Sequence, residues 1–240
     1  MKLTQIFKAF RGAMPVKSCG AVIVAAGSAS RMGGIDKVMA PICGEPMIVH
    51  TVRAFQNCNA IREIVVVTRQ ELIEPIMNLC RDFDKVQAVI IGGATRQESV
   101  EIGLGALSKY VKLAAIHDGA RPLISGEVIH RTVREASDCG AAAPAIPVKD
   151  TIKEVQNSVV TKTPDRSALF AVQTPQIFDV DILAGALHKA KMDDAAVTDD
   201  CSAVERLGMP VRMVEGDERN IKVTTPMDLK IAELLLEEMK

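Results

Sequence analysis

A phosphate-binding loop is the chemistry that the sequence indicates first. The small residues 25–27 directly follow an apolar run, residues 21–24, which is short enough to be a buried strand. Arg31 and Lys37 come soon after. A strand that runs into a small-residue loop and then a helix lets the backbone close on a phosphate, and the two cations can reach that anion. The alternative is an ordinary tight turn, which has no need of two nearby cations.

Chemistry-bearing residues also follow three later strands of the predicted fold. They occupy residues 92–96, with Ser99 one turn into the next helix, residues 118–122 and residues 220–224. In a doubly wound sheet, ligands bind at the carboxyl ends of the strands. Four such segments at the same edge of the sheet therefore predict a pocket.

The residues of this pocket have alternative interpretations. Asp118 can accept hydrogen bonds from sugar hydroxyls or hold a phosphate-bound Mg²⁺, or it can simply pair with Arg121 in its loop. The glycine pair 92–93 could form only a turn and Ser99 could be a hydroxyl on a helix face, but together they could read a nucleobase edge. We interpret His117 as a satisfied core histidine rather than a catalyst.

Alternating strand-like and helix-like stretches position these residues. The β-α-β-α order predicts an α/β fold, a Rossmann-like three-layer sandwich with a mostly parallel sheet covered on both faces. The predicted strands are residues 21–24, 64–68, 86–91, 113–117, 141–147 and 210–215. The predicted helices are residues 46–55, 71–81, 97–110, 125–139 and 226–239, and the α/β pattern resumes over residues 180–191.

One segment departs from this pattern. Residues 150–155 and 158–163 are polar-rich extended runs around Gln156-Asn157, which predict a β-hairpin that projects from the sheet. A two-stranded arm is marginally stable alone. We therefore expect the arm, residues 148–172, to pack on a second copy of the chain and form a homodimer.

The N-terminal extension, residues 1–17, precedes a single domain, residues 18–240. Apolar residues recur at helical spacing between Leu3 and Phe10, with basic residues among them. One interpretation is a small basic amphipathic helix that touches a membrane or a partner. We favour the other, in which Met14 is the true start and the extension has no function.

The composition of the 240 residues excludes several classes of partner. The net charge is −1, and there is no Trp and one Tyr, which argues against nucleic-acid binding. The six cysteines are scattered without metal-ligand spacing, which is typical of reduced thiols and predicts a cytoplasmic protein. No apolar stretch approaches the roughly 20 residues that a membrane span needs, so we expect no membrane association.

Five motifs carry a family resemblance. They are Ala-Ala-Gly-x-x-x-Arg-Met from residue 25, Asp-x-Ala-Arg-Pro from 118, Asp-Thr-Ile-Lys from 150, Thr-Pro-Gln from 174 and Asn-Ile-Lys-Val-Thr from 220. In this order and at these distances they resemble the 2-C-methyl-D-erythritol 4-phosphate cytidylyltransferases of the non-mevalonate isoprenoid pathway. The resemblance runs from about Cys19 to Met239.

The resemblance implies an enzyme, a nucleotidyltransferase that transfers a cytidylyl group from CTP to 2-C-methyl-D-erythritol 4-phosphate with Mg²⁺ and releases pyrophosphate. By position, the phosphate loop comprises Ala25, Ala26, Gly27, Arg31 and Lys37, and the cytosine pocket Gly92, Gly93 and Ser99. Asp118 matches the carboxylate near the ribose and Mg²⁺, and Lys222 a lysine at the reacting phosphates. Thr151, Arg166, Thr174 and Thr198 match substrate-binding positions, the first two reaching across a dimer.

This reaction explains the residue types. The nucleophile is a phosphate oxygen that is largely ionised at neutral pH, so no general base is needed. Catalysis is then the positioning of two polyanions by fixed positive charge. Arg31, Lys37 and Lys222 suit the triphosphate and the transition state. Arg166 suits bidentate binding of the incoming phosphate.

The chain departs from the family pattern at several places. Ala29 stands where the family has a second glycine, and Asp-Lys-Val at residues 36–38 replaces Pro-Lys-Gln. The segment between Arg31 and Lys37 is about one residue shorter than in common members, and Ala94 stands where many members have Asp. These changes keep the cations, and we expect them to affect the path of the loop, the position of Lys37 and the contacts with the base.

Two other functions compete with this one. A ribitol 5-phosphate cytidylyltransferase shares the fold, the phosphate loop and the C-terminal motif, but Pro164-Asp165-Arg166 ahead of Phe170 favours the methylerythritol enzyme. A non-catalytic nucleotide-binding module is the other alternative. Cations drawn from three distant segments argue against it, because binding alone does not need them at one phosphate.

Overall fold

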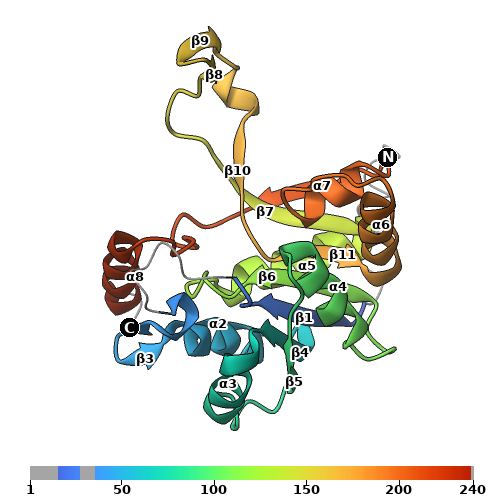
Figure 1. The fold of residues 1–240 in the computed structure, drawn as a ribbon, viewed down its shortest axis with the longest axis vertical. Coiled ribbons are helices and arrows are strands. Elements are labelled where there is room, and N and C mark those ends of the chain that lie inside the picture. Colours follow the sequence, from blue (N-terminus) through green and yellow to red (C-terminus); the bar gives the residue numbers. More distant parts are fainter. Residues whose placement is uncertain (1–15, 28–35, 239–240) are drawn as a thin grey trace, which may run out of the picture.

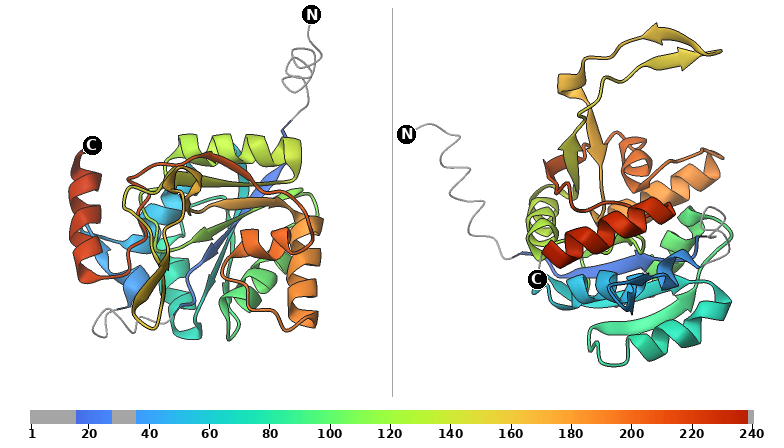
Figure 2. Two further views of the ribbon diagram at one scale, coloured as in Figure 1. Left: turned by 90° about the horizontal axis from the view of Figure 1, so that it is seen from above. Right: turned by 90° about the vertical axis from the view of Figure 1, so that its left-hand side faces the viewer.

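The structure of the chain, a computed structural model, describes residues 16–27 and 36–238. A central sheet carries helices on both faces, as Figures 1 and 2 show. This arrangement confirms the predicted Rossmann-like three-layer α/β sandwich. Arg31, Ala29 and most of the N-terminal extension lie outside the described residues.

The sheet of the described residues is eight-stranded and mostly parallel, in the order β10-β7-β11-β6-β1-β4-β5, with β12 on β7. Strands β6, β1, β4 and β5 run parallel, and β12 runs parallel to β7. The short strands β10 and β11, which the sequence analysis did not predict, run antiparallel to their neighbours. The bounds are β1 Cys19–Val24, β4 Ile61–Thr68, β5 Val86–Ile91, β6 Leu113–Asp118, β7 Ala141–Pro147, β10 Phe170–Val172, β11 Gln176–Asp179 and β12 Arg212–Glu215.

Burial on both faces explains the continuous apolar runs of the central strands. In β1, Ala21 and Ile23 pack beneath one layer of helices and Val22 beneath the other. The first layer contains α2 (Met47–Gln56), α3 (Ile73–Leu79) and α5 (Gly126–Cys139). The second contains α4 (Arg96–Gly105), α6 (Val180–Met192) and α7 (Asp200–Glu205).

Some helix boundaries differ from those predicted. The stretch 71–81 is a 3₁₀ turn, Gln70–Leu72, followed by α3, and α4 ends at Gly105 rather than at residue 110. The start of α4 is fixed by a capping box between Thr95 and Glu98. The sequence analysis did not predict α7, which spans Asp200–Glu205 and is too short for its periodicity to be read.

The predicted hairpin is present, with shorter strands. Strands β8 (Glu154–Gln156) and β9 (Val159–Lys162) are joined by Asn157 and Ser158, one residue beyond the predicted turn. Both residues have positive φ (50° and 64°), as a two-residue hairpin turn of this kind requires. Figures 1 and 2 show the hairpin projecting from the body of the molecule. Its side chains are exposed, Val155, Val159 and Val160 among them.

A third apolar cluster fixes the C-terminal segment. Helix α8 (Pro226–Glu238) packs beside the small hairpin of β2 (Pro41–Ile42) and β3 (Glu45–Pro46), with Ala232 buried between them. The backbone N–H of Val223 donates to the Ala120 carbonyl at 2.9 Å, which ties this segment to the loop after β6. No helix in the described parts of the chain combines the length and apolar character needed to cross a bilayer.

Candidate active site

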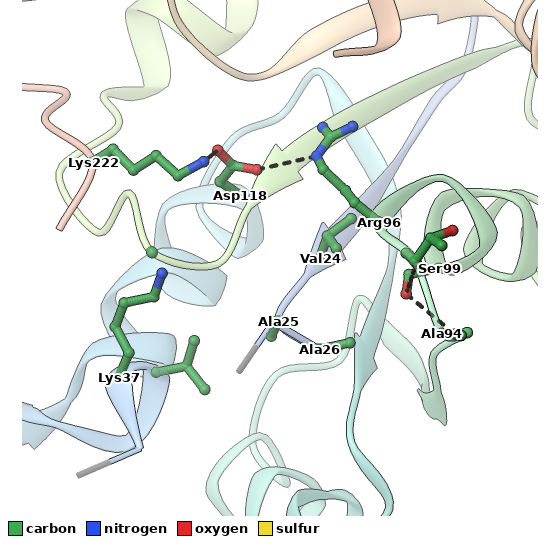
Figure 3. A pocket seen from close by; sticks show the side chains of 14 residues that line it. Val24, Ala25, Ala26, Lys37, Ala94, Arg96, Ser99, Asp118 and Lys222 are labelled. Atoms are coloured by element: carbon green, nitrogen blue, oxygen red, sulfur yellow. Dashed lines mark hydrogen bonds and ion pairs between the residues drawn. The ribbon is translucent and has the colours of Figure 1, made fainter. Parts of the chain in front are cut away.

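A cavity of about 330 Å³ opens where β1, β5 and β6 end, and Figure 3 shows its lining. The four segments predicted to meet at this edge of the sheet all contribute to it. The lining residues are Val24, Ala25, Ala26, Gly27, Lys37, Val38, Gly93, Ala94, Thr95, Arg96, Ser99, Asp118, Ala120 and Lys222.

Most of the residues predicted to contact the nucleotide are in this lining. Gly92 lies directly beneath it, because a Cβ there would come 2.7 Å from Ser99 Oγ and 2.8 Å from Ala26 Cβ. Ser99 Oγ accepts from the Gly93 N–H at 3.2 Å and donates to the Thr95 carbonyl at 2.9 Å. The hydroxyl therefore shapes the glycine loop, and the cavity wall at this point is backbone.

Asp118 is the electrostatic centre of the cavity. Its Oδ2 lies 2.7 Å from Lys222 Nζ and 3.9 Å from Arg121 Nε, and its Oδ1 lies 3.7 Å from Arg96 Nε. The nearest partner is thus Lys222, not the Arg121 of the alternative interpretation. Burial raises the pKa of Asp118, yet the ion pairs with Lys222 and Arg96 outweigh it and bring this pKa down to about 2. The carboxylate is ionised at neutral pH.

The described lining carries a net positive charge. Lys37, Arg96 and Lys222 face the cavity, against the single carboxylate of Asp118. In Figure 3, Lys37 and Lys222 approach from one side and Arg96 from the other. A concave site with this charge attracts a polyanion.

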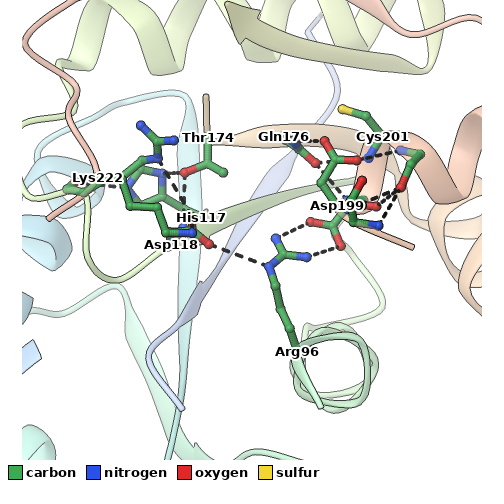
Figure 4. A network of polar contacts seen from close by, with 12 residues as sticks. Arg96, His117, Asp118, Thr174, Gln176, Asp199, Cys201 and Lys222 are labelled. Atoms are coloured by element: carbon green, nitrogen blue, oxygen red, sulfur yellow. Dashed lines mark hydrogen bonds and ion pairs between the residues drawn. The ribbon is translucent and has the colours of Figure 1, made fainter. Parts of the chain in front are cut away.

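Arg96 connects the cavity to a buried polar network that the sequence analysis missed. Its NH1 and NH2 donate to Oδ1 and Oδ2 of Asp200 at 3.1 and 2.7 Å. Figure 4 shows Arg96 between Asp118 on one side and the segment of Asp199 and Cys201 on the other. The sequence analysis placed Arg96 at the end of a strand but gave it no role. The signals that point to the pair are an arginine after the glycine pair and a doubled aspartate, residues 199–200, in the segment after α6.

Asp118 is supported from behind by two buried residues. Its backbone N–H donates to Thr174 Oγ1 at 3.2 Å, and Thr174 Oγ1 lies 2.9 Å from His117 Nδ1. His117 Nε2 contacts the Arg121 carbonyl at 3.2 Å, so Nε2 carries the proton and Nδ1 accepts from the Thr174 hydroxyl. Burial lowers the pKa of His117 to about 4. His117 is the satisfied core histidine expected, and Thr174, predicted to bind substrate, is only 4% exposed.

None of the four predicted substrate-binding residues lines the cavity, and Thr174 lies behind Asp118 rather than in the wall. Thr151 and Arg166 are exposed on the arm, where Arg166 NH1 donates to the Lys149 carbonyl at 2.7 Å. Thr198 is exposed just before α7, and its backbone N–H donates to Ser202 Oγ at 3.2 Å. Thr151, Arg166 and Thr198 therefore have no place in the lining around Asp118 within one chain, and Arg31 lies outside the described residues.

The unusual residue Asp36 has two local partners. Its Oδ1 accepts from the backbone N–H of Val38 at 3.2 Å, capping the 3₁₀ turn Lys37–Met39, and its Oδ2 forms an ion pair with Arg69. Arg69 follows directly after β4. The loop that carries Lys37 is thereby attached to the sheet.

No group of three or more His, Cys, Asp or Glu side chains arranged for a metal occurs among residues 16–27 and 36–238. Asp118 is the one carboxylate of the described lining. Mg²⁺ is commonly held by one or two carboxylates together with substrate phosphates. The donor set therefore fits a metal that arrives with a phosphate ligand.

Comparison with known proteins gives a consistent result. The family model described as 2-C-methyl-D-erythritol 4-phosphate cytidylyltransferase matches residues 19–238. The protein of that name from Symbiobacterium thermophilum is 46% identical over 90% of this chain and 92% of its own, and that from Caldanaerobacter subterraneus is 43% identical over 90% and 97%.

Solved structures are also similar. The 4-diphosphocytidyl-2C-methyl-D-erythritol synthase from Anaerococcus prevotii superposes with a TM-score of 0.84 at 30% identity, covering 92% of this chain and 96% of that one. The 2-C-methyl-D-erythritol 4-phosphate cytidylyltransferase from Thermus thermophilus superposes with a TM-score of 0.76 at 32% identity, covering 90% and 98%.

Proposed function

This chain belongs to the 2-C-methyl-D-erythritol 4-phosphate cytidylyltransferase family and transfers the cytidylyl group of CTP to that sugar-alcohol phosphate, and we propose that the cavity around Asp118 is where it does so. The observation that carries this proposal is the convergence of Lys37, Arg96 and Lys222 on one cavity at the carboxyl edge of the sheet, around the ionised carboxylate of Asp118. Such a site suits a triphosphate bound with a divalent cation.

The small residues of the cavity suit the nucleotide. We assign the triphosphate to the loop Ala25, Ala26 and Gly27 together with Arg31 and Lys37, because backbone can approach phosphate closely there. The base contacts Gly92, Gly93 and the wall that Ser99 supports, and Asp118 accepts from the ribose hydroxyls. Apart from Arg31, which lies outside the described residues, and Gly92, which lies beneath the wall, the assigned residues line one cavity.

The transfer needs no general base. An ionised oxygen of the 2-C-methyl-D-erythritol 4-phosphate attacks the α-phosphorus of CTP in line, a new P–O bond forms, and the bond to the β-phosphate breaks to release pyrophosphate. The side chain of Lys222 is 44% exposed against 12% for Asp118, so Lys222 can turn from the carboxylate to the phosphates. Fixed cations then neutralise the negative charge on the transferred phosphoryl group in the transition state.

We propose that Mg²⁺ completes this site and that Asp118 holds it, directly or through water. Bound there, the ion would act as a Lewis acid and neutralise part of the charge of the triphosphate. Asp118 is suitable because its pKa is about 2, so it is a carboxylate at neutral pH.

We propose a homodimer in which the arm of one chain completes the site of the other. The support is the exposure of Thr151, Arg166 and the apolar side chains of β8 and β9, which an isolated hairpin leaves in water. Arg166 would capture the incoming phosphate, with Thr151, Thr174 and Thr198 near the sugar. We also propose a cytoplasmic location, since all six cysteines are free thiols.

Release of pyrophosphate tests the site. The wild-type protein mixed with CTP, Mg²⁺ and 2-C-methyl-D-erythritol 4-phosphate should release it, and Asp118→Asn should not. Ribitol 5-phosphate in place of the methylerythritol substrate serves as the specificity control. Full turnover by Asp118→Asn would show that the site lies elsewhere.

Subunit mixing tests the arm. Arg166→Ala and Lys222→Ala should each be impaired, and an exchanged mixture should regain turnover, because one site of each mixed dimer has both wild-type residues. If both residues act within one chain, every site keeps one defect and mixing restores nothing.

A further inference from the structure

Arg96 does not offer its guanidinium fork to the cavity. Both terminal nitrogens donate to the two oxygens of Asp200, and only Nε faces Asp118, at 3.7 Å from Oδ1 (Figure 4). A bidentate arginine of this kind has a fixed plane. Arg96 is thus held by Asp200 and directed at Asp118, whereas Lys222 is an exposed partner of the same carboxylate.

Asp200 is fixed in its turn by the sheet. It is 1% exposed, and its backbone N–H and that of Cys201 donate to Gln176 Oε1 at 3.0 and 3.1 Å. Gln176 Nε2 donates to Asp199 Oδ2 at 2.8 Å, and Gln176 belongs to β11, between β6 and β7. Burial raises the pKa of Asp200, and the guanidinium of Arg96 limits that rise.

Stability alone does not account for this buried pair. Taking two charges out of water costs several kcal/mol, and replacing a buried ion pair by apolar residues of similar volume is often neutral or stabilising. The direction of Arg96 Nε points to a second role.

We propose that Arg96 and Asp200 are positioning residues that keep Asp118 oriented while Lys222 leaves it for the nucleotide phosphates. The proposal rests on the proposed function of the Asp118 cavity. Once Lys222 has turned away, the anchored Arg96 remains beside Oδ1 and Arg121 remains 3.9 Å from Oδ2. Behind the carboxylate His117 is neutral at physiological pH, and Lys37 faces it across the cavity.

A paired apolar replacement separates positioning from folding. Arg96→Met combined with Asp200→Leu removes both charges together, so we expect its free energy of unfolding in urea to stay close to the wild-type value. We expect kcat/KM for CTP to fall on the order of 100-fold, because Asp118 loses its fixed partner. Arg96→Met alone should show the same fall in kcat/KM, since Asp200 acts only through Arg96.

The matched control is Arg206→Met, an arginine-to-methionine change at the residue that directly follows α7, whereas Asp200 begins that helix. Arg206 NH2 forms an exposed ion pair with Asp193 at 3.2 Å, so this variant should keep wild-type kcat/KM. Recovery of near wild-type kcat/KM in the paired variant would overturn the proposal and leave the pair purely structural.

Two further variants keep the test decisive. If the paired variant does not fold, the near-isosteric Asp200→Asn replaces it, and wild-type kcat/KM in that variant also overturns the proposal. Asp118→Asn, measured in the same series, tests the premise. An inactive Asp118→Asn beside an active paired variant refutes only the positioning role, whereas an active Asp118→Asn refutes the site and the inference with it.

Discussion

Lys222 Nζ lies 2.7 Å from Asp118 Oδ2, an ion pair that joins the C-terminal segment to the end of β6. The backbone of the segment is anchored beside it by the hydrogen bond from Val223 to Ala120. The lysine is therefore delivered to the cavity by a fixed backbone while its amine can still rotate. This combination suits a cation that exchanges a carboxylate for a phosphate during the reaction.

Lys222→Ala should lower kcat far more than it raises KM for CTP. Removing one preorganised group that stabilises transition-state charge costs roughly 100- to 1000-fold in kcat. Steady-state pyrophosphate release measures both constants. Lys230→Ala, the same change at an exposed position of α8, should leave them unchanged. Near-normal turnover in Lys222→Ala would refute the role assigned to this lysine.

Asp36→Asn should raise KM for CTP about fivefold with little effect on kcat. Asparagine caps a helix turn as well as aspartate does, so the substitution removes the ion pair with Arg69 and keeps the cap. A partly exposed ion pair contributes up to about 1 kcal/mol, and here that energy holds the turn that begins with Lys37.

Glu71→Gln is the control for Asp36→Asn. Glu71 Oε1 also pairs with Arg69, at 3.3 Å from Nε, but its side chain is 64% exposed and it is not part of the Lys37 loop. Its KM for CTP should match the wild-type value. Equal KM values in the two variants would show that Asp36 does not position Lys37.

The sequence predicted the cavity because the residues that build it follow strands whose apolar runs are easily read. Asp118 and Lys222 both stand at such places, and parallel topology brings the strand ends together. The ion pair between Arg96 and Asp200 could not be predicted from the sequence pattern. It depends on how α7 packs against the sheet, and α7 is held there by hydrogen bonds to Gln176. Gln176 is a polar residue in the short antiparallel strand β11, which is too short to show a periodic sequence pattern.

The arm shows a different limit. Alternating polar residues located the hairpin, but the turn falls one residue later than predicted because Asn157 and Ser158 both take positive φ. The pattern cannot tell which cavity Thr151 and Arg166 serve, since in the proposed homodimer that depends on a contact between two chains.

Stability should fall as the pH drops from about 6.5 toward 4, and His117 should cause part of this fall. Burial lowers the pKa of His117 from 6.5 to about 4, so over this range the unfolded chain binds a proton that the folded chain does not. Stability therefore rises with pH across the window and is lost as the pH falls, by at most about 3 kcal/mol for this shift.

Urea unfolding of His117→Gln at several pH values checks this. The variant should be less stable than the wild type at pH 7, and its stability should depend less on pH between 4 and 6.5. The exposed His130→Gln should keep the wild-type pH dependence. An unchanged slope in His117→Gln would mean that other groups cause the acid destabilisation.

Gly103→Ala and Gly105→Ala should have opposite effects on stability, although both lie in α4. A Cβ at Gly103 would come 2.3 Å from Val22 Cγ1 and 2.8 Å from Val67 Cγ2, so α4 would have to move away from the sheet. Overpacking of this kind costs about 1–3 kcal/mol, more than the roughly 1 kcal/mol that alanine gains over glycine in a helix. At Gly105 no atom lies within 4 Å of the added Cβ, so only the gain remains.

The midpoint of urea unfolding should therefore fall for Gly103→Ala and rise for Gly105→Ala. Because α4 begins with Arg96 and also carries Ser99, the displaced helix should raise KM for CTP in Gly103→Ala, whereas Gly105→Ala keeps the wild-type KM. A Gly103→Ala variant as stable and as active as Gly105→Ala would mean that α4 can shift on β1 and β4 without disturbing the cavity. The close contact of α4 with these strands would then not be what holds Arg96 and the glycine loop in place.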